Sequence, residues 1–403
     1  KLIDFDDLNV TCELPKALAL ASIAVRVVHY ASDYITSFAP PEKLASAEWM
    51  TLGGVFEVSL LNLPPPSKKI KGWTMRPVTE MTASVSRMPY PLPQSDGSAP
   101  PPGTAPLLKF TYIIDDAIIL PEKIDTVGFW DTEANEWSTD KQAVADVEFA
   151  YDTRTLTFHT TSLCSLALLQ PTTLELPYKK WIFTPSGSSS GTLYLSTQRF
   201  EVVIDVSAKG CTLKSPDKPE LASILNVPMA AGKLLLRLKG CGINLQPKDA
   251  DASKLKKVVP KDVGLEKALH AALTPLVSRY QLAPSRWNPS RGPKKITVRL
   301  SKSDAFDAED EAPPPADPYA ASEGDWPCLE YAYRRATLIS ALDADATCNE
   351  TPLKEGVSHS TPLECLKGED PDVTDVLHSS SHLYQDTVRQ LMDEIRPLSF
   401  TAA

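Results

Sequence analysis

Short strand-like runs, separated by turn residues at intervals of roughly eight to twelve positions, dominate the middle of this chain. The clearest run is Thr155–Tyr178, which follows a segment at Gly128–Trp137 that carries two tryptophans. The residues Tyr151–Thr155 form a natural hairpin turn between two such runs. Successive runs of this kind are typical of two antiparallel sheets packed face to face. The pattern therefore predicts a β-sandwich that closes near Gln170.

The chain has 403 residues, and single hydrophobic cores usually stop growing near about 250–300 residues. We therefore expect two domains, preceded by a helical segment at residues 1–45. The apolar residues of Leu14–Phe38 lie at near-helical spacing and end before two prolines, which predicts a leading helix. The β-sandwich domain is expected over residues 46–171. A proline-rich stretch at 89–106 interrupts it as an exposed loop, because proline lacks the backbone donor that a sheet needs.

Residues 172–403 are predicted to form an α+β domain. Strand-like runs continue to Lys233–Pro247, which we interpret as a strand. The leucines of Gly264–Leu282 lie near one face, which predicts a helix packed on the sheet despite Pro275.

The last hundred residues combine a loop with further elements. The stretch 303–325 is acidic and rich in proline, which indicates a loosely held loop. Trp326–Leu342 fits a hairpin or a helix, whereas residues 372–396 have the apolar spacing of a C-terminal helix. The predicted fold class is therefore a β-rich α+β protein, with an N-terminal helix, an antiparallel β-sandwich and an α+β domain that ends in a helix.

The formal net charge is −10, which disfavours a nucleic acid as the general partner because phosphate binding rests on clustered Lys and Arg. The seven cysteines form no C-x-x-C pair, which favours buried reduced thiols and a reducing compartment. The chain opens without a basic segment before an apolar core, so we expect no secretory signal. The apolar stretch Leu18–Val28 is too short to span a bilayer. We expect a soluble protein without membrane attachment.

Two residue pairs could carry chemistry. His378 and His382 lie one helical turn apart, but no glutamate follows the first as in a metalloprotease helix, so a solvated helix face is the favoured interpretation. His159 and Cys164 lie five residues apart, which places them on opposite faces of a strand and favours packing over a catalytic couple. We therefore predict no catalytic residue, no metal and no cofactor. The alternative is an enzyme whose site would use His270, Cys241 or the His378/His382 pair in the second half.

Two short basic segments could bind an acidic partner, although a solvated turn is the simpler interpretation of each. One contains an adjacent tryptophan and the other lies in a lysine-rich loop. The tryptophans at 130, 137, 181, 287 and 326 are expected to anchor cores or domain contacts rather than to form ligand cages. The predicted partner surface consists of Lys68, Lys69, Lys71, Trp73, Lys254, Lys256 and Lys257.

The stretch Gly53–Trp73, GGVFEVSLLNLPPPSKKIKGW, resembles a Gly-Gly, Leu-Pro-Pro and Lys-Gly-Trp pattern of the ciliary family called cancer susceptibility candidate one, or axonemal dynein intermediate chain seven. Later landmarks follow in the same order as in that family. They are the two tryptophans of Gly128–Trp137, the turn at Arg279–Asn288 and the terminal segment Ile395–Phe400. Each motif is short, so the resemblance rests on their shared order over most of residues 10–403.

This resemblance implies a non-catalytic subunit tied to the two-headed inner-arm dynein of the axoneme, in the cytoplasm of a cilium or flagellum. It implies contacts with other dynein intermediate chains or a heavy chain, and with α/β-tubulin as a further candidate. The family offers no catalytic residues to transfer. The alternative is a soluble adaptor that binds microtubules or the cytoskeleton and is unrelated to dynein.

Overall fold

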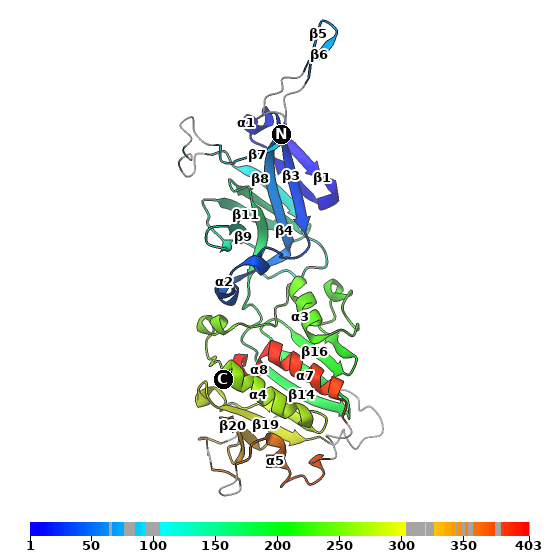
Figure 1. The fold of residues 1–403 in the computed structure, drawn as a ribbon, viewed down its shortest axis with the longest axis vertical. Coiled ribbons are helices and arrows are strands. Elements are labelled where there is room, and N and C mark those ends of the chain that lie inside the picture. The colour runs from blue at the N-terminus through cyan, green and yellow to red at the C-terminus, as the bar shows by residue number, and fades with distance from the viewer. Residues whose placement is uncertain are drawn as a thin grey trace. The chain divides into compact units, whose positions relative to one another are not determined.

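The protein divides into two compact units, Lys1–Pro171 (unit 1) and Thr172–Ala403 (unit 2). Figure 1 shows the ribbon of the computed structural model. The structure describes residues 1–63, 67–75, 85–92, 98, 101, 105–303, 319, 326–343, 345–348, 351–353, 358–374 and 380–402. Most of the proline-rich stretch 89–106 and nearly all of the acidic stretch 303–325 lie outside the described residues, so the two loop predictions remain predictions.

The described part of unit 1 contains two large antiparallel sheets and a separate two-stranded hairpin, β5 (Lys68–Ile70) and β6 (Trp73–Met75). The first has the strand order β1 (Leu2–Phe5), β2 (Val10–Glu13), β8 (Leu108–Ile113), β12 (Thr155–Thr160) and β11 (Val144–Ala150). The second has the order β10 (Glu136–Ser138), β9 (Val127–Asp131), β13 (Ser165–Pro171), β4 (Trp49–Asn62) and β3 (Ile23–Tyr30), and β7 (Ser86–Met88) also pairs with β4. Two short helices, α1 (Lys16–Ala19) and α2 (Pro41–Ser46), lie in the connections.

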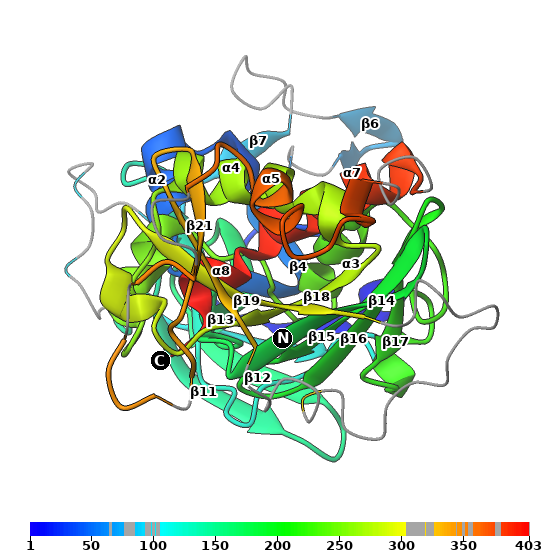
Figure 2. The ribbon, with the colours of Figure 1, turned by 90° about the horizontal axis from the view of Figure 1, so that it is seen from below.

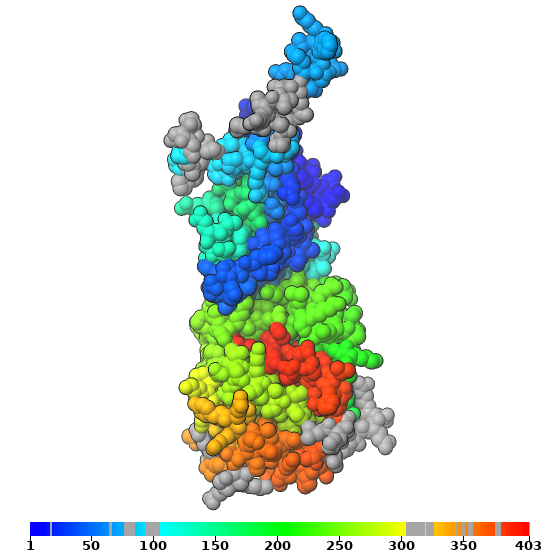
Figure 3. Space-filling model, viewed as in Figure 1, coloured from blue at the N-terminus to red at the C-terminus, as the bar shows by residue number. Residues whose placement is uncertain are grey.

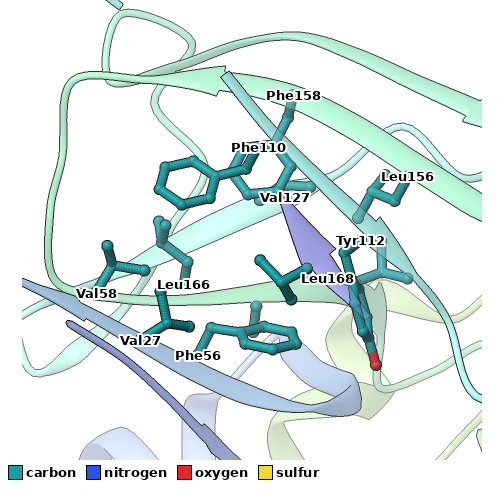
Figure 4. A pocket seen from close by; sticks show the side chains of 12 residues that line it. Val27, Phe56, Val58, Phe110, Tyr112, Val127, Leu156, Phe158, Leu166 and Leu168 are labelled. Carbon is teal, nitrogen blue, oxygen red and sulfur yellow. The ribbon is translucent and has the colours of Figure 1, made fainter. Parts of the chain in front are cut away.

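The two sheets share one apolar core, because alternate residues of each strand face the other sheet. In β8, Leu108, Phe110 and Tyr112 are buried while the residues between them are partly exposed. Figure 4 shows Phe110 and Phe158 of the first sheet facing Leu166 and other aliphatic side chains of the second. A cavity of only about 20 Å³ remains between them. Unit 1 is therefore a β-sandwich, as its strand pattern predicts.

The predicted leading helix over Leu14–Phe38 is wrong. Only Lys16–Ala19 forms an α-helix there, and Ile23–Tyr30 is the strand β3. This strand is rich in β-branched residues, which favour a pleated surface over a helix. It pairs with β4 along its whole length, and Val25 and Val27 pack against the core of the sandwich. Tertiary pairing therefore decides the conformation of a segment whose apolar spacing fits both structures.

Unit 2 is built on one eight-stranded antiparallel sheet. Its order is β17 (Gly210–Ser215), β16 (Glu201–Ser207), β15 (Ser190–Ser196), β14 (Lys180–Gly187), β18 (Tyr280–Pro284), β19 (Ile296–Lys302), β20 (Cys328–Ala332) and β21 (Arg335–Ile339). The helices are α3 (Ala231–Gly240), α4 (Val263–Leu273), α5 (Pro362–Leu366), α7 (His382–Ile395) and α8 (Pro397–Phe400).

The helices α3, α4 and α7 lie over one face of this sheet (Figure 2). In α7, Tyr384, Val388, Leu391 and Ile395 are buried, and their spacing of three to four residues places them on one helix face. The opposite face includes Leu383, which is 67% exposed, and Figure 3 shows this outer surface in red. Strands and packed helices in one unit confirm the β-rich α+β class.

Two predicted elements of unit 2 differ in the structure. The sequence predicts a strand over Lys233–Pro247, but Ala231–Gly240 is the helix α3. Its leucines, lysines and arginine favour helices, and Leu234, Leu235 and Leu238 are buried on one face. The helix predicted over Gly264–Leu282 ends at Leu273, since Pro275 lies in a short 3₁₀ turn, Thr274–Leu276, that precedes β18.

The two remaining predictions for unit 2 agree with the structure. Trp326–Leu342 contains the hairpin of β20 and β21, which selects the hairpin over the helix. The predicted C-terminal helix is α7 over His382–Ile395, whereas residues 375–379 lie outside the described residues.

Candidate functional site

The basic segment with the adjacent tryptophan forms a small two-stranded hairpin. Strand β5 (Lys68–Ile70) pairs with β6 (Trp73–Met75), and Ile70 lies opposite Trp73. Lys71 and Gly72 connect the strands with φ values of 50° and 86°. Two-residue hairpin turns of type I′ need positive φ at both central positions, and glycine adopts this conformation without strain. The sequence Lys-Gly therefore favours the turn that places the two strands side by side.

The hairpin exposes an apolar face. Side chains alternate along a strand, so Lys68 and Ile70 share one face with their cross-strand partners Met75 and Trp73. The exposed fractions are 47% for Ile70, 76% for Trp73 and 51% for Met75. Covering a tryptophan of this exposure would contribute roughly 3 kcal/mol, at about 25 cal/mol per Å² of apolar area. Covering this face would therefore remove a substantial apolar area from water.

The charge of the hairpin is uniformly positive. Lys68, Lys69 and Lys71 are all exposed, and no Asp or Glu occurs between Val58 and Thr79. An apolar face surrounded by lysines fits a partner surface that is apolar at its centre and acidic at its rim. The structure thus brings together four of the seven predicted surface residues, Trp73 included.

The other three predicted residues lie in unit 2 and form a second exposed basic segment. Lys254 ends a 3₁₀ helix at Asp249–Lys254, and Lys256 and Lys257 follow in a turn. Lys257 has a φ of 61°, which gives this turn a left-handed residue. The described neighbours supply no exposed large apolar residue comparable to Trp73. This loop offers charge without an apolar anchor, so it is the weaker of the two candidates.

The residues of the enzyme alternative lie in the helix layer of unit 2. His270 of α4 is buried, and its Nδ1 lies 2.8 Å from Oδ1 of Asp393 in α7. His382 begins α7, which places it about 16 Å from Asp393 along the helix at 1.5 Å per residue. Cys241 follows α3, and His378 lies outside the described residues. His270 therefore contacts Asp393 and links α4 to α7. It does not form a site with His382, which lies at the far end of α7.

His159 and Cys164 each contact a different residue. His159 lies on β12 and approaches Asp146 at 3.5 Å, whereas Cys164 lies within 3.4 Å of Ser162. Burial raises the pKa of the Cys164 thiol, which disfavours the thiolate. Across the described parts of the chain, no three or more His, Cys, Asp or Glu side chains are grouped so that they could hold a metal ion.

A pocket of about 130 Å³ in unit 1 was missed by the sequence predictions. Trp49, Trp130 and Trp137 line it together with two glutamates. The paired tryptophans of β9 and β10 were expected to anchor a core, and Trp137 is indeed buried. Trp49 lies about eighty residues before Trp130 in the sequence. The sequence signal that could have indicated its place in the pocket is its position next to the acidic residue Glu48 at the start of a strand.

The two units define a β-rich α+β protein with an exposed basic hairpin. No protein-family model matches the chain. The chain is similar to dynein axonemal intermediate chain 7 of Danio rerio, with 24% identity over 88% of this chain and 48% of that protein. The corresponding protein of Mus musculus is 25% identical over 89% of this chain and 47% of its own length. The Ciona intestinalis homolog is 26% identical over 65% of this chain and 38% of its own length.

These similarities cover most of the chain and support a relationship to the dynein axonemal intermediate chain 7 proteins. The chain spans about half the length of the two vertebrate relatives. Among the helices that the structure describes, none is both long and apolar enough to cross a lipid bilayer.

Proposed function

We propose that this chain belongs to a non-catalytic structural or regulatory subunit of an axonemal dynein, which acts through protein–protein contacts in the axoneme of a cilium or flagellum. The observation that carries the proposal is the similarity to dynein axonemal intermediate chain 7 proteins over most of the chain. The proposed partners are intermediate chains or a heavy chain of the two-headed inner-arm dynein, with α/β-tubulin as a further candidate.

The hairpin of β5 and β6 supplies a mechanism for this role. A two-stranded hairpin with an uncovered apolar face gains little stability from its own contacts. Exposed Trp73 and Ile70 can become buried anchors in a complex, and the lysines at 68, 69 and 71 can orient an acidic partner during association. The basic segment at Lys254, Lys256 and Lys257 is proposed as a secondary contact.

The proposal can be tested by pull-down from axonemal extracts with the full chain as bait, followed by mass spectrometry of the proteins retained. The hairpin variant carries Trp73→Ser together with Lys68→Gln, Lys69→Gln and Lys71→Gln. A matched variant carries Lys254→Gln, Lys256→Gln and Lys257→Gln, which removes the same number of lysines from the other candidate surface. We expect dynein subunits with the unaltered chain and at least a tenfold loss with the hairpin variant.

Two results would contradict different parts of the proposal. Recovery of no dynein subunit by the unaltered chain would reject the dynein role. Equal recovery by the hairpin variant would retain that role but reject the hairpin as its binding surface. Because both variants change only exposed side chains, their unfolding midpoints should match that of the unaltered chain.

Binding to tubulin is a separate question that co-sedimentation with microtubules can answer. A contact between the lysines of the hairpin and acidic tubulin tails should weaken as salt rises from 50 to about 200 mM, because salt screens exposed charges. Salt-independent sedimentation would exclude such a contact. Sedimentation without any dynein subunit in the pull-down would favour the alternative of a cytoskeletal adaptor.

A further inference from the structure

The pocket of about 130 Å³ in unit 1 is built around three indole rings. Trp130 of β9 and Trp137 of β10 lie directly opposite each other in the hairpin of these strands. Their ring centroids are 5.5 Å apart and their planes are inclined by 77°, so the two rings meet at nearly a right angle. Trp49, at the start of β4, lines the same pocket. Three of the seven tryptophans of the chain therefore converge on one small space.

The N–H group of Trp137 already has hydrogen-bond partners within the protein. Nε1 of Trp137 donates to Oγ1 of Thr36 at 3.0 Å and lies 3.3 Å from Oδ2 of Asp33. Indole has no other hydrogen-bond donor, and Trp137 is only 7% exposed in a cluster with Val55, Ala167 and Leu169, so its ring is a fixed wall of the pocket. Trp49 and Trp130 are half-buried and keep part of their surface accessible. The pocket is thus preformed and aromatic, and one of its walls is held in place.

The charged residues around the pocket carry an excess of negative charge. Glu48 and Glu136 contribute two carboxylates, and Lys43 of α2 contributes one ammonium group. Nζ of Lys43 lies 2.8 Å from Oε2 of Glu136, and the two side chains are 38% and 55% exposed. An exposed ion pair of this kind contributes little stability, so an incoming cation can compete with Lys43 for Glu136.

We propose that this pocket binds a methylated lysine side chain of a protein partner. The faces of indole rings attract cations, and this attraction is stronger where the contact is shielded from water. Methylation keeps the charge of lysine, and a trimethylated head group has no N–H donors left to satisfy. The pocket is smaller than the roughly 300–1,000 Å³ of a typical drug-sized site, which suits the end of one side chain. The inference rests on unit 1 alone and is independent of the proposed role in dynein.

The experiment titrates the full chain with three short peptides that share one sequence. They carry trimethyllysine, unmodified lysine, or the uncharged carbon isostere of trimethyllysine in which a tert-butyl group replaces the trimethylammonium group. Binding is followed by calorimetry and by the indole N–H signals in the NMR spectrum. We expect saturable binding of the trimethyllysine peptide, at least tenfold tighter than that of the other two. Equal binding of the isostere would show that charge is not recognised and would overturn the proposal, as would tighter binding of unmodified lysine or no binding.

Two pairs of variants test the residues that carry the inference. Trp130→Leu removes a π surface but keeps an apolar side chain, and we expect about tenfold weaker binding. Trp130→Phe should weaken binding less, because phenylalanine still presents a π surface, although it attracts cations less strongly than tryptophan. Glu48→Gln removes a carboxylate that lines the pocket and should weaken binding several-fold. Glu148→Gln, at an exposed position of β11 in the other sheet of unit 1, is the charge-matched control outside the pocket. Undiminished binding by both Trp130→Leu and Glu48→Gln would overturn the assignment.

Discussion

The two units differ in what their cores contain. Among the described residues of unit 1, no charged side chain is buried, and the core is formed by aliphatic and aromatic residues of two sheets. Among the described residues of unit 2, nine Asp, Glu, Lys, Arg or His side chains are buried, namely Glu175, Asp251, Lys261, Glu266, His270, Arg279, Arg299, Asp370 and Arg396. Hydrophobic packing is tolerant of shape, whereas a buried charge requires a specific partner. Unit 1 therefore relies on apolar area, and unit 2 on fixed polar contacts.

The contacts of Arg396 illustrate how unit 2 uses such charges. The residue lies between α7 and α8 with a φ of 47°, and its Nε lies 3.0 Å from Oε2 of Glu266 in α4. Asp249 and the hydroxyl of Ser399 are further partners. The side chain of Glu266 is only 1% exposed, so loss of its partner would leave a buried negative charge. One arginine thereby joins helices that are far apart in the sequence.

The largest expected effect comes from Arg396→Met. This change leaves Glu266 without its cation and should lower the free energy of unfolding of unit 2 by about 3–5 kcal/mol. Urea unfolding followed by hydrogen exchange of peptides from each unit would measure the loss separately in the two units. The double variant Arg396→Met with Glu266→Gln should recover part of it, because the buried charge is removed as well. A loss below about 1 kcal/mol in the single variant would contradict the contrast between the units.

A somewhat smaller effect is expected from Leu156→Ala in unit 1. Leu156 is 1% exposed and lines the cavity between the sheets. Loss of its methyl groups should cost about 2–5 kcal/mol, since it removes apolar contacts and enlarges the cavity. The same hydrogen-exchange measurement should show this loss in peptides of unit 1 and leave unit 2 unchanged. The loss should be the same at pH 5 and pH 7, because the change involves no titratable group.

Asp370 should make the stability of unit 2 depend on pH. Burial alone would raise its pKa, but hydrogen bonds from Arg279, Tyr280 and Lys302 outweigh burial and lower the pKa to about 2. A carboxyl whose pKa is lower in the folded state stabilises the fold above its unfolded pKa of about 3.9. This contribution, about 2 kcal/mol, should be lost as the pH falls from about 4 to 2.

Comparison with Asp370→Asn tests this assignment. At pH 6 the variant should be less stable than the unaltered chain, and the difference should shrink as the pH falls toward 2. The measurement is denaturant unfolding at each pH. A difference that stays constant over this range would show that Asp370 is not the titrating group.

The smallest expected effect on stability comes from Trp73→Ser in the exposed hairpin. Trp73 is 76% exposed, so its replacement should change the free energy of unfolding by less than about 0.5 kcal/mol. Thermal unfolding of the full chain would measure this. A loss above about 1 kcal/mol would indicate that the hairpin contributes to the core of unit 1, which would remove the argument for a free binding surface.

Strand alternation predicted the β-sandwich of unit 1 but not its first three strands, β1, β2 and β3, which lie in the predicted helical segment at residues 1–45. Residues of β8 and β12 alternate between buried and partly exposed positions, which is a local pattern. The segment Ile23–Tyr30 is different, because its apolar residues also fit helical spacing and only pairing with β4 selects the strand. In unit 2, the strand prediction for Lys233–Pro247 was wrong. The leucines and lysines of this segment favour a helix, and α3 contains no β-branched residue that would favour a strand.

The candidate sites were predictable to different degrees. A cluster of lysines beside a tryptophan marks Lys68–Trp73 in the sequence, and the turn at Lys71 and Gly72 agrees with a hairpin. The exposure of its apolar face could not be predicted, because a short basic segment can also lie against a core. The pocket of Trp49, Trp130 and Trp137 depends on strands that are about eighty residues apart in sequence, so only the packed sheet brings its walls together.

The contacts of Tyr178 have a consequence for the order in which the chain can fold. Its backbone N–H donates to the carbonyl of Phe400, its carbonyl accepts from Ala402, and its hydroxyl donates to the carbonyl of Ile395. The beginning of unit 2 is thus completed by residues synthesised more than two hundred positions later, whereas every strand of unit 1 lies within the first 171 residues. Since domains generally fold as units during synthesis, N-terminal first, unit 1 can be complete on the ribosome while unit 2 still waits for its last helices.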